Sequence, residues 1–426
     1  MTAEIVIMNK EAVVLAADSA VTIGEGIKIL NTANKVFMLI PKCPIGILIY
    51  NNSTLMDVPW EIIIKEYRDY AIKENLGFSD LVEYPSSFLD FVEKNGFRYV
   101  SDDQESKFFA QMVFSEYGEI LRTIWNEMRK IFYGNAEISD REIKQIASST
   151  IMKFHDEWSG CHDILQEKKS KELRRKLQLK YEKTINEFIV RGFEKFTLSK
   201  KVLRMLTEIA LFTVSKIEKK RGQTPLYTGL VFSGYGKNNL FPVCVNYEVY
   251  CYLCGTLVFL EKDKARVGFS KGDVSSIIMP FAQKDVTLNL LRGILPNYRM
   301  ELESKLIGKF DKKEVASILQ DVDKTVWDNH TKPIMDVVEI LPKDELASVA
   351  RTLVNLTSFM RHVSYGIETV GGPVDVAVIS KKDGFIWIDR KHYFEIEKNI
   401  HFGYDKKGDI HVEANKRKRQ RSKEGV

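Results

Sequence analysis

The sequence predicts an α+β fold in which two β-sheets lie between layers of helix. Three observations predict it. Residues 2–53 contain short runs rich in β-branched residues, residues 57–222 change to helical spacing, and strand-like runs return between residues 228 and 269. Helical segments then continue to residue 363, and two further strand-like runs end near residue 388. Blocks of strand and helix that alternate in this way are typical of layered domains.

Residues 2–53 are expected to form five short strands separated by turns. Asn9-Lys10-Glu11 supplies the first turn, and Val21–Leu30 is the most irregular part, read as a hairpin. The apolar runs are Ile5–Met8, Val13–Ala17, Val36–Ile40 and Ile45–Tyr50. A helix is then expected to follow Asp57, which can act as its cap. Its buried face is predicted from the spacing of Trp60, Ile63, Ile64, Tyr67 and Ala71.

The middle of the chain is expected to be almost entirely helical. Its long helical stretches are Ser106–Phe132, Ser139–Trp158 and Leu165–Arg221. The segment 168–221 contains 17 lysines and arginines. A solvated helical face is the favoured interpretation of that charge, and an acidic partner or nucleic acid is the alternative.

The C-terminal half returns to strands, then helices, then a last hairpin. The strands are expected at Thr228–Gly236, Phe241–Cys251, Gly255–Leu260 and Ala265–Phe269. The helices are expected at Asp285–Leu295, Glu301–Leu306, Lys313–Asp328 and Lys343–Val363. A Lys-Asp-Gly turn joins the last two strands, within residues 365–379 and 385–388. The tail, residues 401–426, is expected to be disordered, because it is polar and six of the eight residues 416–423 are basic; nucleic-acid contact is the minority reading.

Composition limits the classes of protein that the chain can represent. The 426 residues are 44% hydrophobic, enough for a substantial core, and 63 basic against 58 acidic side chains leave a net charge of only +5. This balance does not favour a dedicated nucleic-acid binder. Five cysteines fit a reducing cytoplasm better than a disulfide framework. We expect no signal peptide and no membrane span, since no apolar window reaches about 18 residues.

The start of the chain carries the chemistry of a terminal nucleophile. Thr2 follows the initiator methionine, so loss of one residue makes it the N-terminus. A terminal threonine carries its own general base, because its α-amine, of ordinary pKa about 8, lies beside its hydroxyl. A lysine ammonium favours the developing alkoxide, and a carboxylate holds that lysine in place. Asp18, in Ala-Ala-Asp-Ser, and Lys35, in Asn-Lys-Val, are the candidates for these roles.

This opening resembles the proteasome β-subunit and the related bacterial ATP-dependent protease peptidase, which are N-terminal-nucleophile (Ntn) hydrolases. Their pattern is a terminal threonine, a hairpin that ends in Ala-x-Asp-Ser, and a lysine before an apolar strand. The resemblance covers residues 2–72, 228–270 and 345–389, about half of the chain. It implies a four-layer αββα sandwich with Thr2 as nucleophile, Asp18 as buried acid and Lys35 as active-site lysine.

The predicted organisation follows from this resemblance. Residues 1–74 and 226–400 are expected to form the two parts of the Ntn core. Residues 75–225 are expected to be a large helical insertion between them, for which the family offers no counterpart, and residues 401–426 form the basic tail.

The supporting positions depart from the family pattern. The family presents an amide for the oxyanion from a glycine, and here that place falls at Asn51, whose backbone amide can serve if asparagine adopts the required φ. The family's Gly-Ser-Gly loop has a loose match at residues 268–272, which makes Ser270 a candidate. Apolar residues occupy the family's late Asp and Ser positions, and Glu368 replaces the acid only if the loop differs by one residue.

Other candidate sites are weaker. Cys251 and Cys254 form a Cys-x-x-Cys pair in an apolar strand region without a second pair, so two core thiols are the favoured interpretation. His155 and His162 have no third fixed metal ligand nearby in sequence. No metal site and no organic cofactor is expected.

Two functions from different classes remain open. The first is a threonine-dependent amide hydrolase, a peptidase that acts on peptides or proteins through an acyl-enzyme. The resemblance implies a homo-oligomer, with rings as the family's arrangement, while an ATPase or adaptor partner is not specified. The second is a catalytically inactive αββα scaffold for oligomer assembly or protein binding, favoured by the missing supporting residues.

Overall fold

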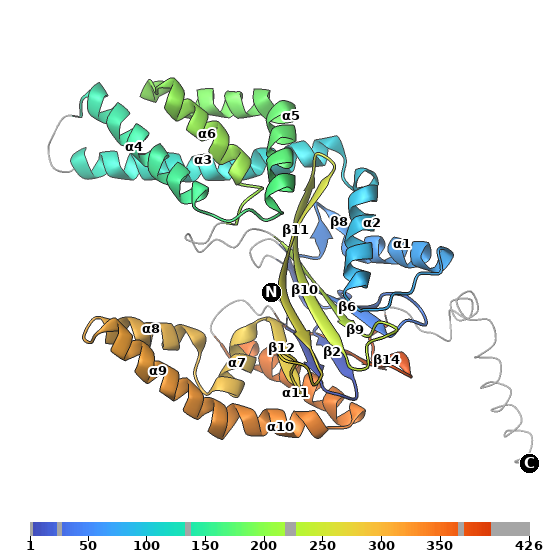
Figure 1. Cartoon of the computed structure of the whole chain (residues 1–426). Coiled ribbons are helices and arrows are strands. Elements are labelled where there is room, and N and C mark those ends of the chain that lie inside the picture. The colour runs from blue at the N-terminus through green and yellow to red at the C-terminus, as the bar shows by residue number, and fades with distance from the viewer. Residues whose placement is uncertain (1–2, 24–27, 133–137, 218–226, 365–369, 393–426) are drawn as a thin grey trace, which may run out of the picture.

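The computed structural model describes residues 3–23, 28–132, 138–217, 227–364 and 370–392. It contains both sheets and helices, so the predicted α+β class is confirmed. Figure 1 shows two sheets near the centre, with the helices α3–α6 at the top of the view and α8 and α9 at the bottom.

The first sheet contains strands from both ends of the chain. Its order is β12-β1-β2-β13-β14, and all neighbours are antiparallel. The turn between β1 and β2 is closed by Asn9, whose side-chain oxygen accepts from the amides of Glu11 and Ala12. The strands are β1 (Glu4–Met8), β2 (Val13–Ala17), β12 (Ile277–Ala282), β13 (Asp375–Ser380) and β14 (Gly384–Asp389).

The second sheet also joins distant parts of the chain. Its order is β11-β10-β9-β6-β5, again antiparallel throughout. The strands are β5 (Val36–Met38), β6 (Ile45–Asn51), β9 (Thr228–Gly234), β10 (Val243–Leu253) and β11 (Thr256–Arg266). Two small hairpins lie outside these sheets: β3 (Val21–Ile23) with β4 (Lys28–Leu30), and β7 (Thr54–Leu55) with β8 (Val58–Pro59).

The two sheets pack face to face around one apolar core. Side chains of a strand alternate between its faces, so Val6 and Met8 of β1 contact the second sheet, where Leu48 and Val231 belong to the same cluster. Ile5 and Ile7 point the other way, into a cluster with α11 (Lys343–His362) and α10 (Lys332–Ile340). Because both faces are covered, every residue of β1 and β2 is buried.

The outer face of the second sheet is covered by α1 (Trp60–Lys73) and α2 (Glu83–Tyr99). The five residues that predicted the buried face of α1 are all buried. Asp57 does not cap this helix: it has a positive φ of 75° in the turn between β7 and β8, and Pro59 occupies the cap position.

The helices α3–α6 form a unit with a core of their own. They are α3 (Asp102–Phe132), α4 (Asp140–Ser159), α5 (Glu167–Phe193) and α6 (Lys200–Phe212), with a short 3-10 turn (Glu194–Phe196) after α5. Ser139 and Glu142 form a capping box at the start of α4. The core of the unit extends to the tip of the β10–β11 hairpin through Cys251, Leu253 and Val258. In contrast, α2 packs in the cluster of α1.

The last helices are α7 (Lys284–Arg292), α8 (Pro296–Ile307) and α9 (Lys312–Val326), followed by a π-helical turn (Trp327–Thr331) before α10 and α11. Strand β12 and helix α10 were not expected from the sequence. The separate strand expected at 265–269 is wrong in part, because β11 runs without interruption to Arg266. None of the helices in the described ranges combines the length and the apolar character that a membrane span requires.

Candidate active site

Asp18 lies directly after β2 and is buried, with an exposed fraction of 1%. Its Oδ1 accepts from the amide of Ala3 at 2.9 Å and from Lys35 Nζ at 2.5 Å. Its Oδ2 accepts from the amides of Ala20 at 3.1 Å and Gly371 at 3.0 Å. A carboxylate that accepts from four donors is fixed in its orientation.

Lys35 comes from the other sheet, just before β5, and is 4% exposed. Its carbonyl accepts from the amide of Ile49 at 2.8 Å, which extends the pairing of β5 with β6. Its ammonium therefore crosses the space between the sheets to reach Asp18. The same Nζ lies 3.5 Å from Glu4 Oε1, a carboxylate of β1 that is also buried.

The fold brings Asp18 to Ala3 through the β1–β2 register. Glu4 pairs with Ala17 in the antiparallel ladder, so the next step of the ladder brings Asp18 beside Ala3. The amide of Asp18 donates to the carbonyl of Ala3 at 3.1 Å, which continues the ladder by one step. The position of the acid therefore follows from the hairpin itself.

Gly371, which lies shortly before β13 and is followed by Gly372, supplies the fourth donor to Asp18. The Gly371 amide donates to Asp18, and the Gly371 carbonyl accepts from the amide of Ser19 at 3.1 Å. Gly372 has a φ of 75°, and a Cβ there would lie 2.9 Å from the Asn31 side chain and 3.0 Å from its carbonyl oxygen. Only glycine fits this turn without strain.

Two of the predicted site residues, Thr2 and Glu368, lie outside the described residues. Ala3, the first described residue, belongs to the same hydrogen-bond network as Lys35. The Ala3 amide nitrogen and Lys35 Nζ both donate hydrogen bonds to the same oxygen, Asp18 Oδ1. These two nitrogens are therefore no more than about 5.4 Å apart, the sum of the two bond lengths.

Asn51 ends β6 with a φ of 69°, a left-handed conformation that asparagine tolerates better than most residues. Its side-chain amide donates to the carbonyl of Tyr227 at 2.8 Å, while its residue is exposed. The backbone amide of Asn51 thus lies at a position of fixed, positive φ. It comes two residues after Ile49, whose amide donates to the carbonyl of Lys35. An oxyanion role for this amide remains a prediction.

Ser270 is not brought together with Asp18 and Lys35. The neighbouring Phe269 ring lies 5.0 Å from Lys10 Nζ, and Lys10 follows the far end of β1. The strand from Glu4 to Met8 separates the two ends by about 13 Å, at roughly 3.3 Å per residue. The loop match at 268–272 was therefore too loose to place a supporting hydroxyl.

Glu4 is the member of the cluster that the sequence interpretation missed. The available signal was an acid between Ala3 and the apolar run Ile5–Met8, because a charge is rarely buried in a strand without a partner. Gly371 was missed for another reason: its amide acts from 353 positions away, which no local pattern reveals.

Aromatic residues lie beside the cluster. Tyr50 precedes Asn51 and its ring lies 5.6 Å from that of Phe281, which adjoins the β12 residue paired with Glu4. Burial raises the pKa of the Tyr50 phenol far above its usual range, and Asn246 Nδ2 donates to its oxygen at 3.0 Å. Burial also raises the pKa of Tyr227 to about 12. Both phenols are therefore neutral at physiological pH.

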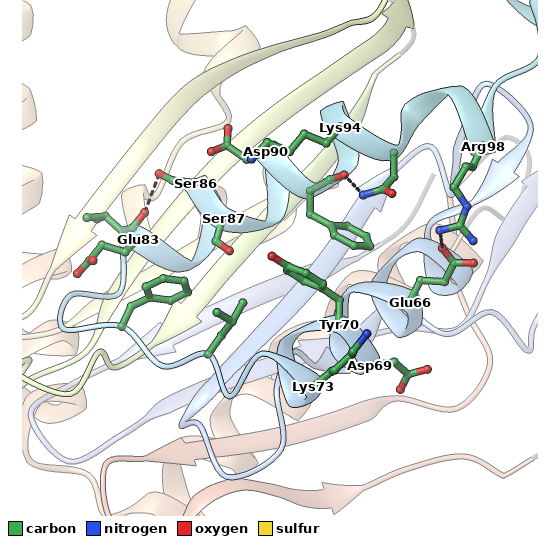
Figure 2. A pocket seen from close by; sticks show the side chains of 15 residues that line it. Glu66, Asp69, Tyr70, Lys73, Glu83, Ser86, Ser87, Asp90, Lys94 and Arg98 are labelled. Carbon is green, nitrogen blue, oxygen red and sulfur yellow. Dashed lines mark hydrogen bonds and ion pairs between the residues drawn. The ribbon is translucent and has the colours of Figure 1, made fainter.

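A cavity of about 1030 Å³ lies elsewhere, between α1 and α2 (Figure 2). Its lining mixes acids and bases such as Asp90 and Lys94. The Ser86 hydroxyl donates to the carbonyl of Val82, and the Ser87 oxygen accepts from Tyr67. Because both hydroxyls are held within the protein and neither has a base beside it in these contacts, this groove does not compete as a nucleophilic site.

The weaker candidates also have structural partners. His155 Nε2 lies 2.7 Å from Glu208 Oε2. Cys251 is buried, and burial raises the pKa of the Cys254 thiol to about 12. Within the described ranges, no group of three or more His, Cys, Asp or Glu side chains is arranged to hold a metal ion.

Comparisons with known proteins found one weak structural similarity. No protein-family model matches the chain, and no curated protein matches it either. Among solved structures, the chain is similar to the Anbu (Gly-1) mutant from Hyphomicrobium sp. strain MC1, with 10% identity, 96% of this chain and 99% of that chain covered, and a TM-score of 0.26. This is a weak structural link.

Proposed function

We propose that the protein is a proteasome-like Ntn hydrolase: a threonine-dependent amide hydrolase, acting on peptides or proteins, whose nucleophile is Thr2 after removal of Met1. The observation that carries the proposal is the shared oxygen Asp18 Oδ1, which holds both the Ala3 amide and the Lys35 ammonium. A terminal nucleophile needs a fixed cation within reach of its hydroxyl, and this oxygen fixes Lys35 beside the start of β1.

The proposed mechanism uses three groups of this chain. The Thr2 hydroxyl attacks the carbonyl carbon of the substrate, and the α-amine of Thr2 accepts the hydroxyl proton. Lys35, oriented by Asp18, stabilises the negative charge that develops on the attacking oxygen. The amide of Asn51 is the proposed donor to the oxyanion. The leaving amine takes the proton, and water then hydrolyses the acyl-enzyme ester to restore Thr2.

The proposed architecture is an Ntn αββα sandwich made of residues 1–74 and 226–400, with residues 75–225 inserted. In support, both sheets contain strands from the two segments, and these strands pair directly, β2 with β13 and β6 with β9. The packing of α2 with α1, and the apolar cluster shared by α3–α6, support an insertion whose own core lies mainly in α3–α6. We further propose a cytoplasmic homo-oligomer, on the grounds of the family resemblance and the five unpaired cysteines.

The second candidate function is an inactive scaffold for assembly. The observation that favours it is the placement of Ser270 at the far end of β1, which leaves the described cluster without the supporting hydroxyl that the loop match suggested. In that case the buried charges would serve folding alone.

The test of the proposal begins with the N-terminus. Intact-mass analysis of purified protein should show loss of Met1, and an electrophile selective for N-terminal threonine should label Thr2. Thr2→Ala should abolish both labelling and hydrolysis, whereas Thr2→Ser, which keeps a hydroxyl, should retain a measurable rate. Retention of Met1 in fully folded protein, or undiminished hydrolysis by Thr2→Ala, would refute threonine catalysis and favour the scaffold.

A further inference from the structure

Helices α8 and α9 form a hairpin, residues 296–326, which Figure 1 shows beyond the sheets at the bottom of the view. Arg299 of α8 ties the two helices together, because it pairs with Asp323 at 2.8 Å and donates to the carbonyl of Leu319 at 3.2 Å. No described residue of the hairpin belongs to the apolar cluster that α10 and α11 form with the first sheet. The hairpin therefore does not extend that core.

The hairpin exposes more apolar side chains than it buries. Among its described residues, the buried apolar side chains are Val315 and Leu319, whereas seven large apolar side chains are each more than a third exposed. The largest exposed fractions are 67% for Met300 and 62% for Tyr298. Trp327, directly after α9, is 51% exposed. Exposed apolar side chains concentrated on one element mark an interaction surface.

The spacing of these side chains places them in a stripe along each helix. Tyr298 and Leu302 are one turn apart in α8, and Ile318 and Val322 are one turn apart in α9. Residues four positions apart share one face of a helix. All four side chains are at least 43% exposed. Each helix of the hairpin thus carries an apolar stripe that lies open among the described residues.

The charges of the hairpin fit a second copy of this chain. Residues 296–326 contain six basic and six acidic side chains, so their net charge is zero. In a symmetric contact the same surface lies on both sides, so a surface with a net charge would repel its copy. A neutral surface avoids that repulsion. It also offers no excess of positive charge to a nucleic acid or an anionic lipid surface.

The exposed apolar area fits the size of a dimer contact. A half-exposed aromatic side chain leaves roughly 75–125 Å² uncovered, and a half-exposed aliphatic side chain roughly 30–60 Å². Three aromatic and five other apolar side chains between residues 298 and 327 then expose roughly 400–700 Å² per copy. A standard interface buries about 800 Å² per partner, of which roughly 450–520 Å² is apolar. The two areas agree.

We propose that the α8–α9 hairpin is the contact between two copies of this chain, and that two hairpins pair symmetrically through their apolar stripes as a four-helix bundle. Each copy then covers the stripes that the other leaves open. The inference rests on the homo-oligomer of the proposed function, whose contact it names, but not on hydrolysis.

The mass of the full-length protein in solution tests this contact. Ile318→Glu combined with Val322→Glu brings like charges from both copies into the bundle. Sedimentation velocity at micromolar concentration should then show the mass of the assembly lowered by at least about a factor of two, with an unchanged far-UV circular dichroism spectrum. If this variant does not fold, Tyr298→Glu combined with Leu302→Glu in α8 makes the same test.

The matched control lies in the helical unit α3–α6. Phe114→Glu combined with Leu179→Glu replaces two apolar side chains that are 67% and 71% exposed, and this variant should keep the full mass. A loss of mass in the control equal to that in the hairpin variant would overturn the proposal, because the effect would not depend on the hairpin.

A charge-reversal experiment tests the symmetry of the contact. Ile318→Lys combined with Val322→Lys should also lower the mass. An equal mixture of the lysine and glutamate variants should restore the full mass, because opposite charges then face each other across the two hairpins. A mixture that stays dissociated would overturn the symmetric pairing.

The remaining outcomes separate this inference from the proposed function. Full mass in the folded glutamate variant would overturn the proposal and leave a homo-oligomer joined by another surface. A monomeric unsubstituted protein would overturn both the proposal and the homo-oligomer, and would leave the hairpin to a different partner. Labelling of the unsubstituted protein by the electrophile for N-terminal threonine tests the hydrolase separately from either result.

Discussion

Asp18→Asn should destabilise the folded protein by about 3–5 kcal/mol, the cost of breaking a buried ion pair by removing one charge. Asp18 accepts four hydrogen bonds, two at each oxygen. Asparagine keeps one oxygen and places an NH₂ group, itself a donor, at the other position. Whichever way the amide turns, two donors lose their acceptor.

The magnitude follows from which donors are lost. If the NH₂ group faces Ala20 and Gly371, two buried backbone amides are left unsatisfied, at roughly 1–3 kcal/mol each. If it faces Ala3 and Lys35, one backbone amide and a buried ammonium lose their partner. These costs belong to one network and do not add simply to the loss of the ion pair. Either orientation consumes a large part of a typical free energy of unfolding of about 5–15 kcal/mol.

The assay is urea unfolding at neutral pH, with Asp375→Asn as the matched control. Asp375 is also buried, and among the described residues its side chain accepts from two donors, the amide and the ammonium of Lys391. An asparagine there can keep its oxygen on the backbone amide, so fewer buried donors lose their acceptor and the expected loss is smaller than for Asp18→Asn. A cost of Asp18→Asn no greater than that of Asp375→Asn would refute the four-donor account of the site.

Three further predictions follow from other parts of the molecule. Lys35→Ala should reduce the turnover number strongly and also lower stability, because Asp18, a buried acid, loses its ion pair with Lys35; a wild-type rate and stability would contradict the assignment. Gly96→Ala in α2 should destabilise by about 1–3 kcal/mol, because a Cβ would lie 2.1 Å from the ring of Tyr252, whereas Gly118→Ala in α3, with open space around it, should stabilise by about 0.5–1 kcal/mol in the same unfolding assay. Deletion of residues 414–426 should leave the unfolding midpoint and hydrolysis unchanged, and titration of both proteins with DNA and RNA at two salt concentrations should show no tail-dependent affinity; tight binding that disappears with the tail would contradict this.

The sequence located most elements through local patterns. The runs at 5–8, 13–17 and 45–50 became β1, β2 and β6, and the helical spacing after Trp60 became α1. The errors fell where local pattern and tertiary context differ. Strand β12 was missed because Ile277–Ala282 contains a proline and no clear alternation, and it forms by pairing with β1 at the sheet edge. The Asp57 cap was wrong because a positive φ in the β7–β8 turn was not visible in the sequence.

The sequence by itself determined the order and chemical type of the candidate groups: a threonine one residue from the start, an acid at the end of the second strand, and a lysine before the next apolar strand. It also determined that Asn51 can adopt its left-handed φ, because that tolerance is a property of the residue. Only the tertiary structure decided which groups meet. It placed Glu4 beside Lys35, brought the Gly371 amide to Asp18, and left Ser270 at the other end of β1. The physical reason is that periodicity and spacing express interactions between near neighbours, whereas contacts between distant residues depend on strand order and register, which form only when the sheets pack.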